Sequence, residues 1–110
     1  MTDKIIVKQS GAIARIIFNQ PEKRNAVSLE MWEAVEVALD KFAADKDVRV
    51  LILSGAGGKA FVSGADISKF ESERASADGV ARYNATTKRV YDKVDAFPKP
   101  TIAQIDGFCV

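Results

Sequence analysis

The chain is short, close to neutral and free of histidine, and these properties exclude several classes of function. Its 110 residues are 47% hydrophobic and 28% charged, which suits one domain with a modest core. A net charge of +1, from 16 Lys and Arg against 15 Asp and Glu, does not favour nucleic acid or a membrane surface as partner. The absence of histidine excludes Ser-His-Asp and Cys-His nucleophile systems, His-rich metal sites and imidazole bases within the chain.

The start of the chain and its single cysteine indicate a compartment. Cys109 has no partner for an internal disulfide, which suits a reducing environment. The N-terminal residues lack the apolar region of a signal peptide, and no apolar stretch is long enough to span a bilayer. We therefore expect a cytoplasmic, soluble protein that uses neither a membrane nor nucleic acid.

The first elements are expected to be a β-hairpin and a polar loop. Residues 5–7 and 13–18 are β-branched runs separated by Ser10-Gly11, a pattern typical of strand, tight turn and strand. Residues 19–25 are polar and contain a proline, which predicts an exposed loop.

An amphipathic helix and a buried strand should follow this loop. Ser28 suits the N-cap of a helix that ends within residues 44–47. Residues 48–53 are apolar on both faces beyond Arg49, as in a strand buried on both sides of a parallel sheet, so the segment predicts a right-handed βαβ unit. Apolar residues recur at helical spacing and should be core: Leu29, Trp32, Val35, Leu39 and Phe42.

The second half should contain a turn, a short helix, a long helix and a last strand. Asp66 is expected to cap a short helix carrying Ile67 and Phe70, before a mobile loop over residues 71–79. Pro98 should end the long helix, and residues 101–105 are typical of a strand. The apolar positions of the long helix are Val80, Tyr83, Thr87, Val90, Val94 and Phe97.

The glycine cluster after the buried strand has two interpretations. Residues 55–60 fit G-x-G-x-x-A, a loose dinucleotide fingerprint, but residues 61–64 look extended where the fingerprint requires a helix. A Walker loop fails because Ala60 follows Gly58-Lys59. A flexible turn is favoured, and a dinucleotide-binding oxidoreductase remains a hypothesis.

Two short stretches are candidates for binding an anion. Residues 63–66 place a glycine and a small residue before a helix start, which would expose backbone N–H groups to an oxyanion. The alternative is an ordinary glycine turn with Asp66 as N-cap, and local physics alone favours it. Lys23 and Arg24 suit either a phosphate group or a solvated loop. Trp32 and Phe42 are interpreted as core, and none of the carboxylates has the apolar surroundings expected of a catalytic acid.

Four stretches in order resemble the enoyl-CoA hydratase/isomerase (crotonase) family: residues 17–26, the buried strand through Ser54-Gly55, residues 60–67 and residues 99–107. The second is weak by itself, and the other three in this order are highly specific. The resemblance implies an α/β fold, the crotonase-like spiral of ββα units. It also implies an acyl-CoA thioester substrate whose carbonyl oxygen is held by backbone N–H groups, and a reaction through a stabilised thioester enolate.

The resemblance also assigns site residues by motif. It implies that the backbone N–H of Ala65 is the first oxyanion donor. Lys23, Arg24 and Ala26 resemble the loop that lines the pantetheine and phosphate groups of coenzyme A. The wall around the thioester and adenine would be formed by Ser63, Ala65, Asp66 and Ile67. No metal and no cofactor are implied, since coenzyme A is part of the substrate.

The resemblance covers the N-terminal part of the family's core domain, residues 1–110 of this chain. The family's second oxyanion donor, acid/base carboxylates and C-terminal trimerisation helices are expected beyond Val110. We therefore expect that these 110 residues alone do not catalyse hydration, and that the full-length protein forms a homotrimer or a hexamer.

The leading hypothesis is an enoyl-CoA hydratase. The alternatives are another reaction of the family (isomerase, dehalogenase, decarboxylase or hydrolase), a non-catalytic acyl-CoA-binding homologue, and the dinucleotide-binding oxidoreductase.

Overall fold

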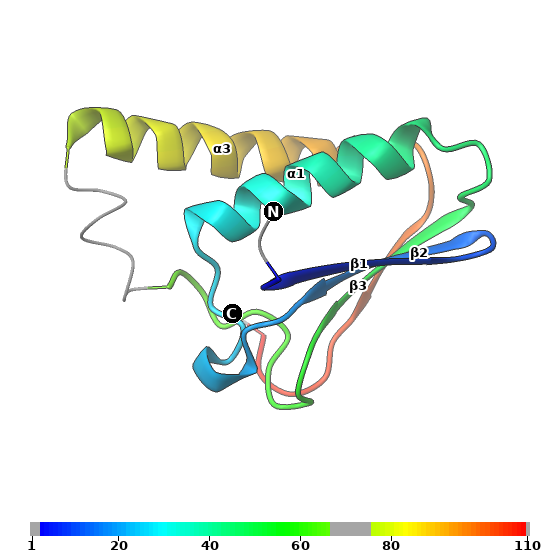
Figure 1. The fold of residues 1–110 in the computed structure, drawn as a ribbon, viewed down its shortest axis with the longest axis horizontal. Helices are drawn as coiled ribbons and strands as arrows, with labels where there is room; N and C mark the ends of the chain where they lie inside the picture. The colour runs from blue at the N-terminus through cyan, green and yellow to red at the C-terminus, as the bar shows by residue number, and fades with distance from the viewer. Residues whose placement is uncertain (1–2, 67–75, 110) are drawn as a thin grey trace.

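Two long helices lie on one side of a four-stranded sheet (Figure 1). A computed structural model describes residues 3–66 and 76–109. The sheet order follows the chain order: β1 (Ile5–Ser10), β2 (Ile13–Phe18), β3 (Val50–Gly55) and β4 (Thr101–Gln104). The helices are α1 (Leu29–Ala44) and α3 (Ala77–Asp95), and a short 3-10 helix, η1 (Pro21–Lys23), follows β2.

The predicted hairpin and parallel strand are confirmed. β1 and β2 pair antiparallel from Ile5 opposite Phe18 to Ser10 opposite Ile13, and Gly11 takes a left-handed φ of 59° at the turn. β3 pairs parallel with β2, and β4 pairs parallel with β3. The connection from β2 through α1 to β3 is thus a βαβ crossover, whose right-handedness stays a prediction.

The core lies between α1 and the sheet. Ser28 caps α1, its side chain accepting a hydrogen bond from the Met31 N–H at 3.4 Å, and the helix ends at Ala44 as predicted. Its buried residues are Leu29, Met31, Ala34, Val35, Ala38, Leu39 and Phe42. The predicted apolar face is therefore confirmed except at Trp32, which is only partly buried.

Helix α3 begins earlier than expected. Ser76 is its N-cap, with the Oγ 3.0 Å from the Gly79 N–H, so residues 77–79 are helical and the predicted loop over 71–79 is wrong there. The helix ends at Asp95, before Pro98, as the sequence predicted. The rest of that loop, and the short helix with Ile67 and Phe70, lie outside the described residues.

The second face of the sheet departs from the prediction. Leu51 is the fully buried residue of β3, its neighbours in the strand are partly exposed, and every residue of β4 is exposed. Both long helices lie on the same side (Figure 1), so the predicted burial of this strand on both faces is wrong for the described residues. Ile102 of β4 keeps 51% of its side-chain surface exposed.

Candidate functional site

The loop after β2 is organised around two buried polar side chains. Gln20 and Asn25 are both 0% exposed, so the prediction of an exposed loop is wrong at these positions. The Asn25 amide donates to the carbonyls of Ala56 at 3.0 Å and Ala60 at 2.8 Å, and its Oδ1 accepts from the Gln20 N–H at 2.8 Å. Asn25 has a φ of 59°, a left-handed conformation that asparagine tolerates better than most residues. This side chain joins η1 to the glycine loop.

The glycine loop is packed rather than free, and no helix follows it. A Cβ on Gly55 would lie 2.4 Å from the carbonyl oxygens of Ala60 and Phe61, so the close approach of the chain requires glycine here. Residues 56–66 contain no helix, and Ala60 instead forms an isolated parallel bridge with Phe108. The pyrophosphate-binding helix of a dinucleotide fingerprint is therefore missing from these residues.

The backbone N–H of Ala65 has no acceptor within the described part of the chain. Val27 pairs with Ala65 in an isolated parallel bridge. The Val27 N–H donates to the Gly64 carbonyl at 2.8 Å, and the Asp66 N–H donates to the Val27 carbonyl at 3.0 Å. The N–H between them forms no hydrogen bond among residues 3–66 and 76–109, and Ala65 is exposed. It borders a pocket of about 210 Å³, which is also lined by Trp32, Val62, Gly64, Tyr83, Thr87 and Tyr91.

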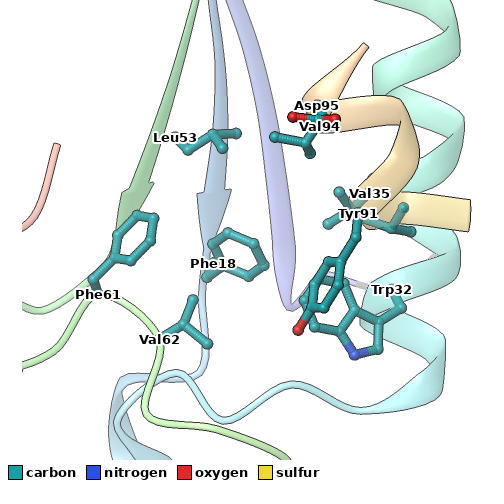
Figure 2. Close-up of a pocket in the computed structure, with 10 residues that line it drawn as sticks. Phe18, Trp32, Val35, Leu53, Phe61, Val62, Tyr91, Val94 and Asp95 are labelled. Carbon is teal, nitrogen blue, oxygen red and sulfur yellow. The ribbon is translucent and has the colours of Figure 1, made fainter. Parts of the chain in front are cut away.

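A larger apolar pocket adjoins this one. Its volume is about 430 Å³, and its wall comes from β2, β3, the segment after β3 and the two helices (Figure 2). The Phe18 ring stands edge-on to Trp32 and to Phe61, with centroid distances of 6.3 Å and 6.0 Å. Trp32, Val62 and Tyr91 line both pockets, so the two lie next to each other at these side chains. The interpretation of Trp32 as a core residue therefore has to be corrected.

Lys23, Ser63 and Asp66 are brought together beside the Ala65 segment. The Lys23 Nζ lies 3.6 Å from the Asp66 Oδ2, and the Ser63 hydroxyl donates to the Lys23 carbonyl at 3.4 Å. The Lys23 side chain is 40% exposed, whereas that of Asp66 is 2% exposed. The buried Asp66 carboxylate thus holds the Lys23 ammonium group, which remains partly exposed at the surface of the site.

The other predicted residues are placed differently. Arg24 turns toward the segment after β4, its guanidinium 5.7 Å from the centroid of the Phe108 ring. Ala26 is buried, its N–H donates to the Lys23 carbonyl, and its carbonyl accepts from Gln20. Both backbone groups of Ala26 are therefore already used within the loop. Ile67 lies outside the described residues.

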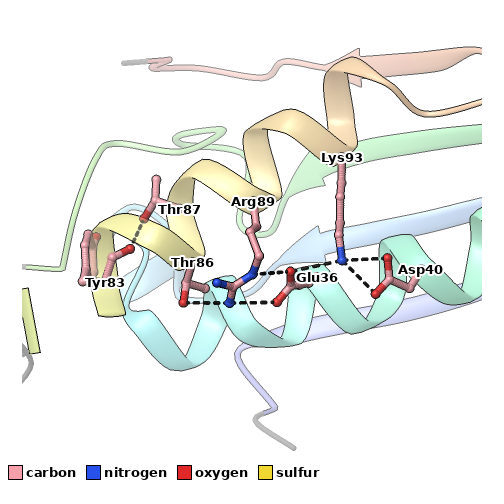
Figure 3. Close-up of polar contacts among 7 residues, drawn as sticks. All are labelled: Glu36, Asp40, Tyr83, Thr86, Thr87, Arg89 and Lys93. Atoms are coloured by element: carbon pink, nitrogen blue, oxygen red, sulfur yellow. Dashed lines mark hydrogen bonds and ion pairs between the residues drawn. The ribbon is translucent and has the colours of Figure 1, made fainter. Parts of the chain in front are cut away.

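The groups with shifted pKa values lie elsewhere, along α1 and α3 (Figure 3). The Arg89 guanidinium, followed by Lys93, holds the pKa of Glu36 below its ordinary value, although partial burial opposes the shift. The contact with Glu36 raises the pKa of Arg89, and contacts with Asp40 and then Glu36 raise the pKa of Lys93. Glu36 is thus a structural carboxylate that stays ionised, unlike a general acid.

Two kinds of site are absent from the described part of the chain. No group of three or more His, Cys, Asp or Glu side chains within residues 3–66 and 76–109 is arranged to hold a metal ion. No helix in those ranges is long and apolar enough to cross a membrane.

Sequence reasoning missed Gln20, Asn25 and Tyr91. Nothing local marks Gln20 and Asn25, because their partners lie up to 46 positions away in the chain. Tyr91 had a usable signal, since it follows Tyr83 and Thr87 at intervals of four residues and so shares their helix face. That face of α3 borders the pocket at Ala65.

The fold and this pair of pockets define an α/β protein in which a backbone donor, without an acceptor among the described residues, belongs to a residue beside an apolar cavity. The family model for enoyl-CoA hydratase/isomerase matches residues 13–110. The chain therefore belongs to the enoyl-CoA hydratase/isomerase family, as the sequence motifs indicated.

Relatives in this family share both sequence and fold with the chain. A short-chain-enoyl-CoA hydratase of Clostridium acetobutylicum is 29% identical over 98% of this chain and 41% of its own length. A mitochondrial Delta(3,5)-Delta(2,4)-dienoyl-CoA isomerase of Mus musculus is 33% identical over 89% of this chain and 32% of its own. The crystal structure of an enoyl-CoA hydratase/carnithine racemase from Magnetospirillum magneticum matches with a TM-score of 0.87 and 40% identity, over 97% of this chain and 40% of that one. The chain thus spans about two fifths or less of these relatives.

Proposed function

We propose that the protein to which this chain belongs acts on acyl-CoA thioesters, with hydration of an enoyl-CoA as its reaction. The observation that carries the proposal is made at Ala65: its N–H has no acceptor among the described residues, and the residue lines one pocket beside a larger apolar one. A thioester carbonyl oxygen that accepts a hydrogen bond from this N–H would have its acyl chain directed past Trp32 and Tyr91 into the apolar pocket. The hydratase name of the Clostridium relative supports the choice of reaction.

The chemistry asked of this chain is stabilisation of negative charge. Addition of water to the double bond of an enoyl thioester places charge on the thioester oxygen as an enolate. A fixed backbone N–H aimed at that oxygen contributes roughly 3–4 kcal/mol, judged from removal of such donors elsewhere. The second donor and the acid/base carboxylates are proposed to follow Val110, with residues 1–110 forming the N-terminal part of one domain.

Coenzyme A would bind along the loop that carries η1. Lys23 and Arg24 are exposed cations on this loop, and both suit phosphate oxygens. Ala26 and Ser63 would shape the same path, while Asp66 supports Lys23 from inside. A part for Ile67 in the site is proposed from the sequence motif alone. No further cofactor is proposed.

The decisive experiment compares two substitutions at Ala65. Ala65→Pro removes the backbone N–H. Ala65→Ser keeps the backbone N–H and has a side chain of similar size to alanine. Acetoacetyl-CoA presents an enolate oxygen at the thioester and serves as the probe, with coenzyme A itself as reference, in isothermal titration calorimetry. We expect Ala65→Pro to weaken acetoacetyl-CoA binding about 100-fold and coenzyme A binding little, with Ala65→Ser close to wild type. Equal binding of the probe by both variants would remove Ala65 from the oxyanion role.

An isomerase is the second candidate, favoured by the 33% identity to the mouse dienoyl-CoA isomerase. Both reactions pass through an enolate, so the Ala65 experiment does not separate them. Incubation with a 2-enoyl-CoA and with a 3,5-dienoyl-CoA does, because a hydratase consumes the first and an isomerase of the mouse relative's kind converts the second to a 2,4-dienoyl-CoA. Coenzyme A binding without either turnover would support a non-catalytic acyl-CoA-binding homologue.

We also propose a trimer or a hexamer of the full-length protein, which sedimentation equilibrium would test.

A further inference from the structure

Gln20 lies between the two parts of the site just described. It is fully buried, and it immediately precedes η1, which carries Lys23. Its Nε2 donates to the Ala26 carbonyl at 2.7 Å and to the Asp66 Oδ2 at 3.0 Å. One amide nitrogen therefore ties the η1 loop to the residue next to Ala65.

The orientation of this amide is fixed by its neighbours. Both partners are acceptors, so only the NH2 end of the carboxamide fits between them. The Oε1 end is buried and makes no hydrogen bond within the described residues. What Gln20 contributes thus depends on its two N–H donors, and an acceptor or an apolar group in their place would leave Asp66 without this partner.

Asp66 passes this constraint to the oxyanion donor. Its carboxylate accepts from Gln20 while its own N–H donates to the Val27 carbonyl at 3.0 Å. Ala65 immediately precedes Asp66, which is held by both of these hydrogen bonds. The Gly64 carbonyl, in the same peptide group as the Ala65 N–H, accepts from the Val27 N–H at 2.8 Å. The same carboxylate lies 3.6 Å from the Lys23 Nζ.

We propose that Gln20 is a positioning residue that couples the direction of the Ala65 N–H to the placement of the Lys23 loop. Through its bridge between Ala26 and Asp66, it keeps the oxyanion donor and the phosphate-binding cation at a fixed separation. The inference rests on the proposed function, since it assigns Gln20 a part in binding the thioester end of the same ligand.

The first test removes the donors without creating a cavity. Gln20→Met keeps the length of the side chain and lacks both N–H groups. Titration with acetoacetyl-CoA and with coenzyme A should show about tenfold weaker binding of the first, the size of one hydrogen bond to a charged group, and less than about threefold for the second. A merely structural role would weaken both ligands alike. Circular dichroism establishes that the variant is folded before either titration.

The second test uses one variant at two pH values and does not depend on Gln20→Met folding. Gln20→Glu places a second carboxyl about 3 Å from Asp66, near Lys23, which raises the pKa of one member of the carboxyl pair. Once protonated, the new carboxyl donates to Asp66 as the amide does. Acetoacetyl-CoA affinity should therefore be low at pH 8 and recover about tenfold at pH 5.5, relative to wild type at each pH. Gln9→Glu, an exposed glutamine on β1, controls for the added charge.

The outcomes separate the two proposals. Selective loss of acetoacetyl-CoA binding, recovered by Gln20→Glu at low pH, supports the positioning role. Unchanged affinities in folded Gln20 variants, or equal loss for both ligands without pH recovery, overturn it and leave the Ala65 assignment intact. A wild-type protein that binds neither ligand overturns the proposed function, and the role of Gln20 with it.

Discussion

Two groups of polar side chains hold this fold together, and they differ mainly in their exposure to water. Between α1 and α3, an ion pair joins Arg82 to Glu33, at 2.9 Å. Others join Arg89 to Glu36, and Lys93 to both Glu36 and Asp40, at 2.9–3.1 Å (Figure 3). In the loop after β2, two neutral side chains, Gln20 and Asn25, make hydrogen bonds of 2.7–3.0 Å with no exposure. From charge alone, the ion pairs would be expected to contribute more to stability than the neutral hydrogen bonds.

Exposure reverses that order. In an exposed ion pair, each charged group gives up contacts with water for contact with its partner, and the two have nearly equal free energy. Double-mutant cycles give about 0.2–1 kcal/mol for such pairs. Removal of a buried amide leaves its former hydrogen-bond partners without a partner, because water does not reach them. The cost is about 1–3 kcal/mol for each such group. The neutral pair near the candidate site should therefore matter more to folding than the larger set of charges between the helices.

The largest expected effect tests this ranking at Asn25. Asn25→Ala leaves the Ala56 and Ala60 carbonyls and the Gln20 N–H without their partner, and we expect a loss of about 4 kcal/mol in the free energy of unfolding. Urea denaturation measures it. Asn19→Ala is the matched control, because the Asn19 side-chain amide donates an exposed hydrogen bond, at 3.1 Å to the Asp3 carbonyl. Similar losses for the two variants would show that burial does not set the difference.

The same contrast explains how far the sequence could predict the molecule. The hairpin, α1 and the parallel β3 follow from patterns within a few residues: β-branched runs, a Ser28 cap and apolar side chains at helical spacing. Burial of Asn25 depends on Ala60, 35 positions later, so the polar composition of the loop predicted exposure instead. Ser76 was a local N-cap signal for the early start of α3, and the sequence prediction missed it.

The candidate site divides in the same way. The motif around Ala65 was recognisable in the sequence. The structure adds that its N–H has no acceptor among the described residues and that the residue lines a pocket. Trp32 was interpreted as core because helical periodicity marks the face of a helix that turns inward, but it does not distinguish packed core from pocket wall. Only the placement of α3 beside α1 makes that distinction.

An intermediate effect is expected at Glu36, the least exposed member of the interhelix pairs at 17%. Arg89 lowers its pKa from the ordinary value of 4.5. A carboxyl with a depressed folded pKa stabilises the fold above its unfolded pKa, and this contribution is lost as the pH falls through the folded pKa. Glu36→Gln should therefore destabilise the protein at pH 7 and have little effect at pH 3.

Urea denaturation across this range checks the expectation at Glu36. Glu30→Gln is the control, since Glu30 is exposed on the same helix and belongs to none of the ion pairs between α1 and α3. A Glu36→Gln penalty that persists unchanged at pH 3 would mean that packing, and not the charge, accounts for it.

The smallest effect sharpens the comparison from the exposed end. The side chains of Arg82 and Glu33 are 64% and 43% exposed, although their 2.9 Å contact is as short as that between Arg89 and Glu36. Arg82→Ala should change the free energy of unfolding by less than about 0.5 kcal/mol, and addition of 0.5 M NaCl should abolish the remaining difference. A larger, salt-insensitive loss would show that the Arg82 stem packs on α1. Distance alone would predict equal losses for Arg82 and Arg89, so the pair of measurements separates contact geometry from exposure as the quantity that determines what a polar contact contributes.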